Sequence, residues 1–237
     1  MLFRSLLKRT LRYLQKTDAV NVLAEGPPFN KADYEIKRIP YQDTKPFILN
    51  IHYAHRMPSV SYAYGLFRNA ELVGVITYGM PASNTLCKGI CGEEWKKNVI
   101  ELNRLVLKDN LKNEASYLIS GSLKLLDAPK IVVSYADSAQ NHSGFVYRAT
   151  NFLFTGTTKP RTDMASANGK HSRHHAGDRS NRVERSAKHR YVTFVGDKRQ
   201  KKLMMASLKY TVLPYPKIDA HALRSMGKIE VVNEHSR

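Results

Sequence analysis

The chain has 237 residues, enough for one well-buried domain with extensions. Its 38 Lys and Arg outnumber its 20 Asp and Glu, and the formal net charge of +18 indicates a polyanionic partner, most simply a nucleic acid. Two cysteines, no secretory leader and no membrane-spanning stretch exclude a secreted, disulfide-stabilised protein and predict a cytoplasmic one.

Residues 1–30 predict a basic amphipathic helix followed by a linker. One helical face carries the apolar side chains and the other carries Lys and Arg, and Pro27 and Pro28 interrupt the pattern. We expect this helix to pack on the domain or lie against DNA. An interfacial membrane helix and a targeting presequence are the alternatives.

The next segments predict a strand, a helix and a hairpin. We expect a strand over Tyr34–Pro40, a helix over Thr44–His55 that Pro58 ends, and a β-hairpin over 62–79 with its turn at 68–71. Residues 80–97 are polar and lack periodicity, which predicts irregular structure. Cys87 and Cys91 lie within it, and without a second ligand pair they are interpreted as structural thiols rather than zinc ligands.

Residues 99–107 predict a strand with polar side chains on both faces. Alternation puts Glu101 and Asn103 on one face and Arg104 on the other. Polar groups in a buried strand are costly unless they are paired or work in a site. Glu101 and Arg104 are therefore candidate site residues, which would position a base or a phosphate.

A second strand–helix–strand unit follows. We expect a helix over Asn113–Leu126, a strand over 130–135, a polar loop over 136–142, a helix over 143–151 and a strand over 152–158. Asp137, Gln140, Asn141 and His142 follow the apolar strand. Because functional groups collect where such strands end, this loop is the first candidate for an active site. Asp137 would orient a histidine, bind a metal or accept a proton; the alternative is that it caps the next helix.

After residue 158 the chain becomes basic and poor in apolar side chains. Residues 155–237 hold 18 basic and 7 acidic side chains, and 159–190 predict a flexible arm or long loop. Strand-like patterns return at 191–195 and 208–213. The predicted division is a helix and linker at 1–30, a catalytic domain at 31–160 and a basic arm with terminal strands at 161–237. The predicted DNA-contacting residues are Arg161, Lys170, Arg173, Arg179, Arg182, Arg185, Lys188 and Arg190.

The order of these elements indicates the fold class. A hairpin that leads into a strand–helix–strand unit is typical of the acyl-CoA N-acyltransferase (GNAT-like) fold, an α/β fold. We therefore expect a mixed sheet flanked by helices, with a basic C-terminal extension.

His52 and His55 are three residues apart, so on a helix they share one face. Two imidazoles do not complete a metal site, and they would equally cap the carbonyls at a helix end. If Asp137 lies near them, two histidines and one carboxylate with open positions would suit a non-haem iron. Tyr147, on the helix after the candidate loop, would face the same cleft or fill the core.

Several longer stretches resemble the Mom family of phage DNA-modification proteins. They are HYAHRMPSVSYAYGLF, GVITYGMPAS, LCKGICGEE, ELNRLVL and VSYADSAQNHSGFVYRATNFLFTGTT, which together span residues 50–165 in order and spacing. The resemblance implies a GNAT-like enzyme in the host bacterial cytoplasm. It would convert adenine in double-stranded DNA to N6-carbamoylmethyladenine and so protect phage DNA from restriction. The functional residues that it implies are His52, Tyr53, Asp137 and Tyr147, supported by Glu101 and Arg104.

One departure from GNAT enzymes concerns the donor. Those enzymes hold the pyrophosphate of coenzyme A with a glycine-containing turn before a helix, whereas LKDNLKNEASY has no glycine. This argues against acetyl-CoA and leaves the donor of the carbamoylmethyl group unnamed, although Asn113 and Ser116 at the helix start would still hold another phosphate. The rival hypotheses are a conventional N-acyltransferase acting on an amine of a protein or small molecule, and a non-catalytic nucleic-acid-binding protein.

Overall fold

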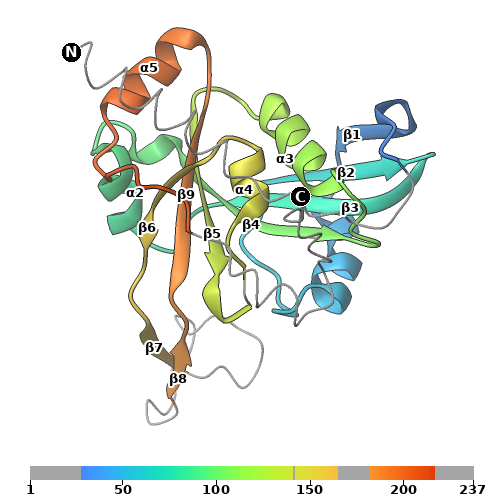
Figure 1. Ribbon diagram of the computed structural model, residues 1–237, viewed down its shortest axis with the longest axis horizontal. Coiled ribbons are helices and arrows are strands. Elements are labelled where there is room, and N and C mark those ends of the chain that lie inside the picture. Colours follow the sequence, from blue (N-terminus) through green and yellow to red (C-terminus); the bar gives the residue numbers. More distant parts are fainter. Residues whose placement is uncertain (1–27, 141, 165–181, 217–237) are drawn as a thin grey trace, which may run out of the picture.

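The computed structural model describes residues 28–140, 142–164 and 182–216. They form a seven-stranded mixed sheet in the order β1-β2-β3-β4-β5-β9-β6, with helices on both faces, and a separate two-stranded ribbon (Figure 1). The sheet strands are β1 (Tyr34–Arg38), β2 (Tyr62–Arg68), β3 (Glu71–Gly79), β4 (Val99–Leu107), β5 (Lys130–Asp137), β6 (Leu153–Thr157) and β9 (Lys188–Val195); the ribbon is β7 (Arg161–Met164) with β8 (Arg182–Arg185). The predicted α/β class is confirmed.

The helical elements are short. They are η1 (Lys31–Asp33), η2 (Tyr41–Thr44), η3 (Phe47–Ile51), α2 (Asn84–Cys91), η4 (Lys96–Asn98), α3 (Glu114–Leu125), η5 (Ser138–Gln140), α4 (Phe145–Ala149) and α5 (Lys198–Ala206). Helices α3 and α4 pack on one face of the sheet, and α2 and α5 pack on the other. Among the residues that the structure describes, no helix is long and apolar enough to cross a bilayer.

The predicted hairpin is confirmed as β2 and β3, which are antiparallel. Asn69 and Ala70 connect them with φ angles of 49° and 68°. Two residues with positive φ match the twist of a tight hairpin, which explains the abrupt reversal. The hairpin places β3 beside β4, so it forms the antiparallel half of the sheet.

Strand β4 contains a β-bulge. Two consecutive residues of β3 pair with Leu102 and Arg104, so Asn103 between them has no partner on β3. An extra residue shifts the alternation of side chains by one position. Leu102 and Leu105 therefore pack in one core cluster. The prediction that Glu101 and Arg104 point to opposite sides is wrong, because the bulge puts both side chains on the other face.

Two helix predictions are also corrected. The helix expected over 44–55 is η2 followed by η3, and it ends at Ile51, so His52 and His55 do not share a helical face. The segment expected to be irregular contains α2, which Ser83 caps with its side chain. Cys87 and Cys91 lie on α2, where both side chains are buried and neither forms a disulfide, as expected for structural cysteines.

Strand β9 lies between β5 and β6, antiparallel to both. It pairs with β5 along its whole length, and Tyr191 and Val192 are fully buried. The sheet of the predicted catalytic domain is therefore completed by residues beyond its expected end at residue 160. Part of the expected flexible arm is ordered as β7, β8 and the start of β9, and the strand expected at 208–213 is not regular structure.

Candidate active site

The candidate site lies where β4 and β5 separate. These parallel strands pair only over Val99–Leu102 and Ile131–Ser134, although β4 continues to Leu107 and β5 to Asp137. Polar side chains from five parts of the chain converge at the end of this pairing and beyond it. They are His52, Tyr53, Glu101, Arg104, Ser134, Asp137, Tyr147 and Lys188. All six predicted catalytic residues belong to this group.

His52 follows η3 in an extended conformation. Its Nδ1 accepts a hydrogen bond from the backbone N–H of Ala54 at 3.0 Å, so in the neutral ring the proton is on Nε2. Burial, reinforced by the positive charge of Arg104, lowers the pKa of His52 to about 4. At neutral pH this imidazole is therefore an uncharged hydrogen-bond donor through Nε2.

Tyr53 offers an aromatic surface at the mouth of the site. Its ring stacks on His52 with the centroids 4.4 Å apart and lies edge-on to His142 at 6.1 Å. The residue is nevertheless 47% exposed, so one part of the ring is open to a partner. Burial and the charge of Asp137 raise the pKa of its hydroxyl, which stays protonated.

Glu101 is the carboxyl group of the site that titrates near neutrality. Burial raises its pKa to about 7, although Arg104 and Lys188 act in the opposite direction. Within the described part of the chain, its carboxylate has no hydrogen bond or ion pair. A carboxyl group with this pKa is suited to exchange protons at neutral pH.

Arg104 is held by backbone carbonyls rather than by a carboxylate. Its guanidinium donates to the carbonyl of Asn103 at 2.7 Å and to that of Arg56 at 3.1 Å. Its Nε is buried and has no partner among the described residues, and burial lowers its pKa. Arg104 therefore contributes positive charge near Tyr53 and Glu101.

Asp137 ends β5 and is anchored on both oxygens. Its Oδ2 forms an ion pair with Lys188 Nζ at 3.1 Å, and its Oδ1 accepts hydrogen bonds from Ser186 Oγ and from the backbone N–H of Ala139. Burial raises the pKa of Asp137, but the bonds from Ser186 and Lys188 outweigh burial and the pKa lies below its ordinary value. This carboxylate is ionised and fixed in place.

Tyr147 reaches the site from α4. The residue is 8% exposed, and burial raises its pKa to about 12 although a hydrogen bond with Ser134 acts against this. Ser134 also donates to the carbonyl of Leu102 at 2.9 Å, across the last paired position of β4 and β5. Ser134, Ser186 and Lys188 were not predicted as catalytic-site residues. A serine within the apolar run KIVVSYAD was the one local signal for Ser134.

The predicted metal ligands do not fit a shared iron ion. His55 donates through Nδ1 to the carbonyl of Leu49 at 2.7 Å, which leaves its Nε2 unprotonated, but His52 accepts at Nδ1 and carries its proton on Nε2, and both oxygens of Asp137 have partners. A metal would need a deprotonated ring nitrogen on the side that faces it. In the described ranges, no group of three or more His, Cys, Asp or Glu is arranged to hold a metal.

The start of α3 is filled by the chain's own carboxylate. Glu114, fully buried, accepts hydrogen bonds from the backbone N–H of Leu111 at 2.9 Å and from the hydroxyl of Tyr34 at 3.0 Å. It also forms an ion pair with Arg68 at 3.1 Å. A phosphate at this helix start would meet the negative charge of Glu114, which already holds Leu111, Tyr34 and Arg68.

Asn113 and Ser116, the predicted cofactor-binding residues, lie at the same helix start. Asn113 has a φ of 68° and makes no capping hydrogen bond with its side chain, while Ser116 donates to the carbonyl of Asn113 at 3.0 Å. Glu114 therefore adds a buried carboxylate beside the predicted phosphate position, and binding of a phosphate there stays a prediction.

The predicted DNA-contacting residues separate into three groups. Lys170, Arg173 and Arg179 lie outside the described residues. Lys188 pairs with Asp137, and Arg190 donates to Thr155 through its Nε at 3.0 Å and lies 3.5 Å from the ring centre of Tyr210, so both are engaged within the fold. Arg161, Arg182 and Arg185 lie on the ribbon.

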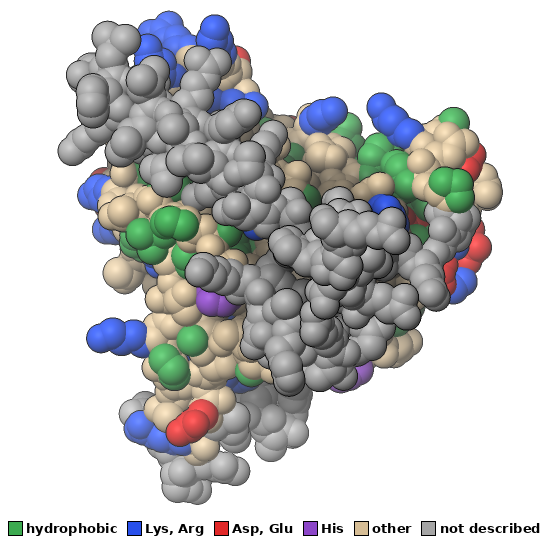
Figure 2. All heavy atoms as spheres, in the orientation of Figure 1, with side chains coloured by type: hydrophobic (Ala, Val, Ile, Leu, Met, Phe, Trp, Pro, Cys, Tyr) green, Lys and Arg blue, Asp and Glu red, His purple; other side chains and the backbone are tan. Residues whose placement is uncertain are grey.

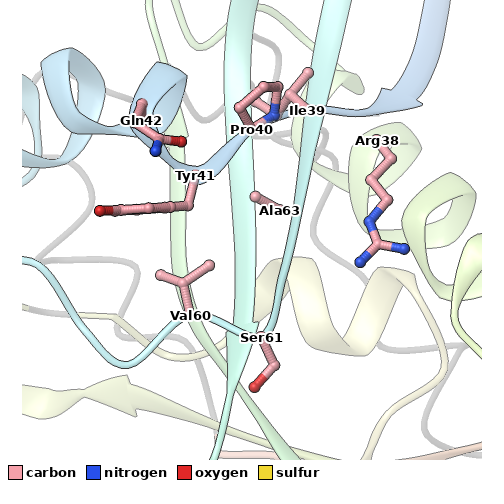
Figure 3. A pocket seen from close by; sticks show the side chains of 8 residues that line it. All are labelled: Arg38, Ile39, Pro40, Tyr41, Gln42, Val60, Ser61 and Ala63. Carbon is pink, nitrogen blue, oxygen red and sulfur yellow. The ribbon is translucent and has the colours of Figure 1, made fainter.

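A separate cavity of about 570 Å³ lies between the β1–η2 loop and β2. Figure 3 shows Arg38 and Tyr41 on opposite sides of Ala63, with Ser61 below them. None of the predicted site residues lines this cavity. The loop that carries His52 and Tyr53 continues into its wall at Val60 and Ser61, so the cavity and the candidate site are neighbours along the chain but distinct.

Solved structures with a similar arrangement are acetyltransferases. A GNAT-family acetyltransferase from Bacillus cereus ATCC 10987 is 10% identical, with a TM-score of 0.40, and covers 69% of this chain and 99% of its own. A Bacillus subtilis acetyltransferase in complex with CoA is 11% identical, with a TM-score of 0.37, and covers 69% of this chain and 98% of its own.

The sequence comparisons are more specific. The methylcarbamoylase mom of Escherichia phage Mu is 26% identical over 228 residues, which is 87% of this chain and 93% of that protein. The model of the Mom protein family matches residues 33–217. This range contains every described strand and all of the converging site residues, and the chain belongs to the Mom protein family.

Proposed function

We propose that this chain is a methylcarbamoylase that joins a carbamoylmethyl group to N6 of adenine in double-stranded DNA. The observation that carries the proposal is the convergence of His52, Tyr53, Glu101 and Asp137 at one sheet edge in a member of the Mom family. The similarity to a phage methylcarbamoylase supports the kind of group transferred. The charge of +18 supports DNA as the substrate.

The target base must leave the duplex before it can react, because N6 of a paired adenine is hydrogen-bonded to thymine. Extrusion costs a few kcal/mol, roughly, and aromatic stacking in the enzyme offsets it. The open part of the Tyr53 ring, supported from behind by His52, is the stacking surface for the extruded adenine. The cations of the chain hold the phosphates meanwhile.

The transfer forms one bond and breaks one. N6 attacks the methylene carbon of a donor that carries the carbamoylmethyl group on a leaving group, and the leaving group departs with the bonding electron pair. Glu101 takes the proton that N6 loses, because its pKa of about 7 keeps the proton-accepting form available at neutral pH. The Nε2–H of neutral His52 donates to the oxygen of the incoming group.

Asp137 is held too firmly to act as the proton acceptor. Its low pKa and its bonds to Lys188, Ser186 and Ala139 make it a poor proton acceptor. Its fixed negative charge instead orients Lys188 and holds the segment after β8 against the end of β5. Asp137 is thus a positioning residue, and Glu101 is the proton acceptor.

Mass spectrometry of nucleosides from plasmid DNA tests the proposal. Cells that express the wild-type chain should yield an adenosine heavier by one carbamoylmethyl group, and cells that express Asp137→Ala or Glu101→Gln should not. The same plasmid should resist restriction enzymes whose sites contain adenine. Unmodified adenine from soluble wild-type protein would overturn the proposal and favour the N-acyltransferase hypothesis.

A further inference from the structure

The two-stranded ribbon β7–β8 projects from the body of the molecule at the site edge of the sheet. It is a separate sheet in which Arg161 pairs with Arg185 and Met164 with Arg182. Figure 1 shows it extending beyond β6 and β9, at the opposite end of the molecule from α5. Each strand has four residues, or about 13 Å, which is the length of roughly four base-pair steps.

The ribbon carries a mixture of hydrogen-bonding groups rather than cations alone. Thr162 is opposite Glu184 in the register, and alternation puts Arg182 on the same face as this pair. All three residues are exposed. Base edges in the major groove are recognised by such a mixture of donors, acceptors and methyl groups, because each base pair presents a different pattern there.

Helix α5 differs from the ribbon in composition. It begins Lys198, Arg199, Gln200, Lys201 and Lys202, and the one carboxylate beside these cations, Asp197, caps the helix. Figure 2 shows Lys and Arg side chains gathered at this end of the molecule, whereas an acidic group lies among the side chains at the ribbon end. Uniform cations contact phosphates and do not distinguish bases. By this comparison, α5 is suited to contact phosphates and the ribbon is suited to contact base edges.

The base of the ribbon is fastened to the candidate site. Ser186, the residue after β8, donates to Asp137, and the carbonyl of Ala187 accepts from Ser138 through the backbone N–H and the hydroxyl. On the other strand, Thr158 and Lys188 exchange two hydrogen bonds, at 2.9 and 3.0 Å. A duplex in contact with the ribbon is therefore held at a fixed offset from Asp137.

We propose that the β7–β8 ribbon enters the major groove beside the target adenine and selects the flanking bases through Thr162, Arg182 and Glu184. The major groove admits a two-stranded ribbon, and the N6 amino group of adenine lies in that groove. The inference rests on the proposed function for its choice of duplex DNA. It adds that the ribbon carries the base readout and names the residues that do so.

Selection from a randomised duplex library tests the ribbon directly. Purified full-length protein is bound to the library, and the retained duplexes are sequenced for wild type, Arg182→Gln, Glu184→Gln and the matched double variant Lys201→Gln, Lys202→Gln on α5. We expect the wild type to enrich a short motif. Each ribbon variant should lose discrimination at one or two positions by about tenfold. The α5 variant should bind all sequences more weakly and keep the motif.

Two results would overturn the inference: a wild type that enriches no motif, or ribbon variants that enrich the wild-type motif undiminished. The positions are exposed, so unchanged thermal unfolding is expected and shows that the variants are folded. Binding selection needs no catalysis. If the proposed function is wrong, adenine in cells stays unmodified. If the ribbon proposal is wrong, the enriched motif is missing or does not change in the ribbon variants.

Discussion

Glu101 and Arg104 lie on the same face of β4 because Asn103, the residue before Arg104, is bulged out of the pairing with β3. The bulge turns a strand that would present these charges to opposite layers into one that presents both to the site. Each of the two groups shifts the pKa of the other. Bulges that re-aim a side chain beside an active site are a recurring feature of sheets.

The substitution Glu101→Gln should abolish product and stabilise the fold at alkaline pH. The folded pKa of Glu101 is about 7 against a reference of 4.5, so its stabilising effect is complete below 4.5 and is lost as the pH rises through 7. This contribution to the free energy of unfolding is on the order of 3 kcal/mol, and a glutamine at position 101 does not show its pH dependence. Urea unfolding at pH 5 and pH 8 measures it, with Glu35→Gln as an exposed control. Equal pH dependence in wild type and Glu101→Gln would contradict the assignment.

His52 should remain neutral through the physiological range. Its pKa of about 4 lies below the ordinary 6.5, so this group's contribution to stability is present above 6.5 and is lost as the pH falls through 4. NMR of nitrogen-15-labelled imidazoles should show an Nε2–H tautomer that does not titrate above pH 5, roughly. His52→Gln identifies the resonance. A protonation midpoint near 6.5 would show that the ring is solvated instead.

Variants at Asp137 and Ser186 should lose product without losing affinity for DNA. Asp137→Ala should eliminate product while the affinity for duplex DNA stays nearly unchanged, because the carboxylate holds Lys188 rather than a phosphate. Ser186→Ala removes one of its bonds and should reduce product partially, and Ser186→Thr should restore it. Nucleoside mass spectrometry and fluorescence anisotropy of a labelled duplex give the two readouts. Full activity of Asp137→Ala would remove this residue from the mechanism.

Gly79→Ala should damage the site from a distance. A Cβ at Gly79 would lie 1.9 Å from the carbonyl oxygen of Ser59, which accepts a hydrogen bond from Asn103 at 2.8 Å. Overpacking of this kind costs about 1–3 kcal/mol and would displace the loop whose Arg56 carbonyl holds Arg104. The midpoint temperature of thermal unfolding and the yield of modified adenine should both fall.

The matched control is Gly89→Ala, where the added methyl group approaches only the Tyr210 side chain. That variant should keep its activity, because a side-chain hydroxyl can move aside and alanine favours a helix. Equal losses of product in the two glycine variants would show that the contact of Gly79 with the loop beside the bulge does not control activity.

Glu114→Ala should destabilise the fold without opening a coenzyme A site. Its removal leaves Arg68 with Asp109 alone and frees the hydroxyl of Tyr34, and breaking a buried pair costs roughly 3 kcal/mol. Thermal unfolding measures this cost, with Glu71→Gln as an exposed ion-pair control. Calorimetry should detect no binding of coenzyme A to the wild type; saturable binding would show that the helix start accepts a pyrophosphate after all.

The elements that were predicted correctly depend on residues that lie close together in the chain. The hairpin of β2 and β3, the strand β4, the helix α3 and the unit from β5 to β6 follow from apolar periodicity and turn residues that lie close together in the chain. Asp137, His52 and Tyr147 were candidates from their residue types and positions, and the Mom resemblance added Tyr53. Periodicity alone gave only the polar positions in β4 and the loop after β5.

Pairing between distant segments decided the rest. A bulge depends on the register against a neighbouring strand, so no alternation within residues 99–107 could reveal that Asn103 is the extra residue. The strand expected at 191–195 was assigned to a basic extension outside the catalytic domain; it is β9, an interior strand of the sheet, because β5 and β6 each offer it an edge. Amino-acid sequence by itself determined the elements, the charge and the candidate groups. Tertiary structure alone decided which of them meet, because a sheet forms from hydrogen bonds between residues far apart in the chain.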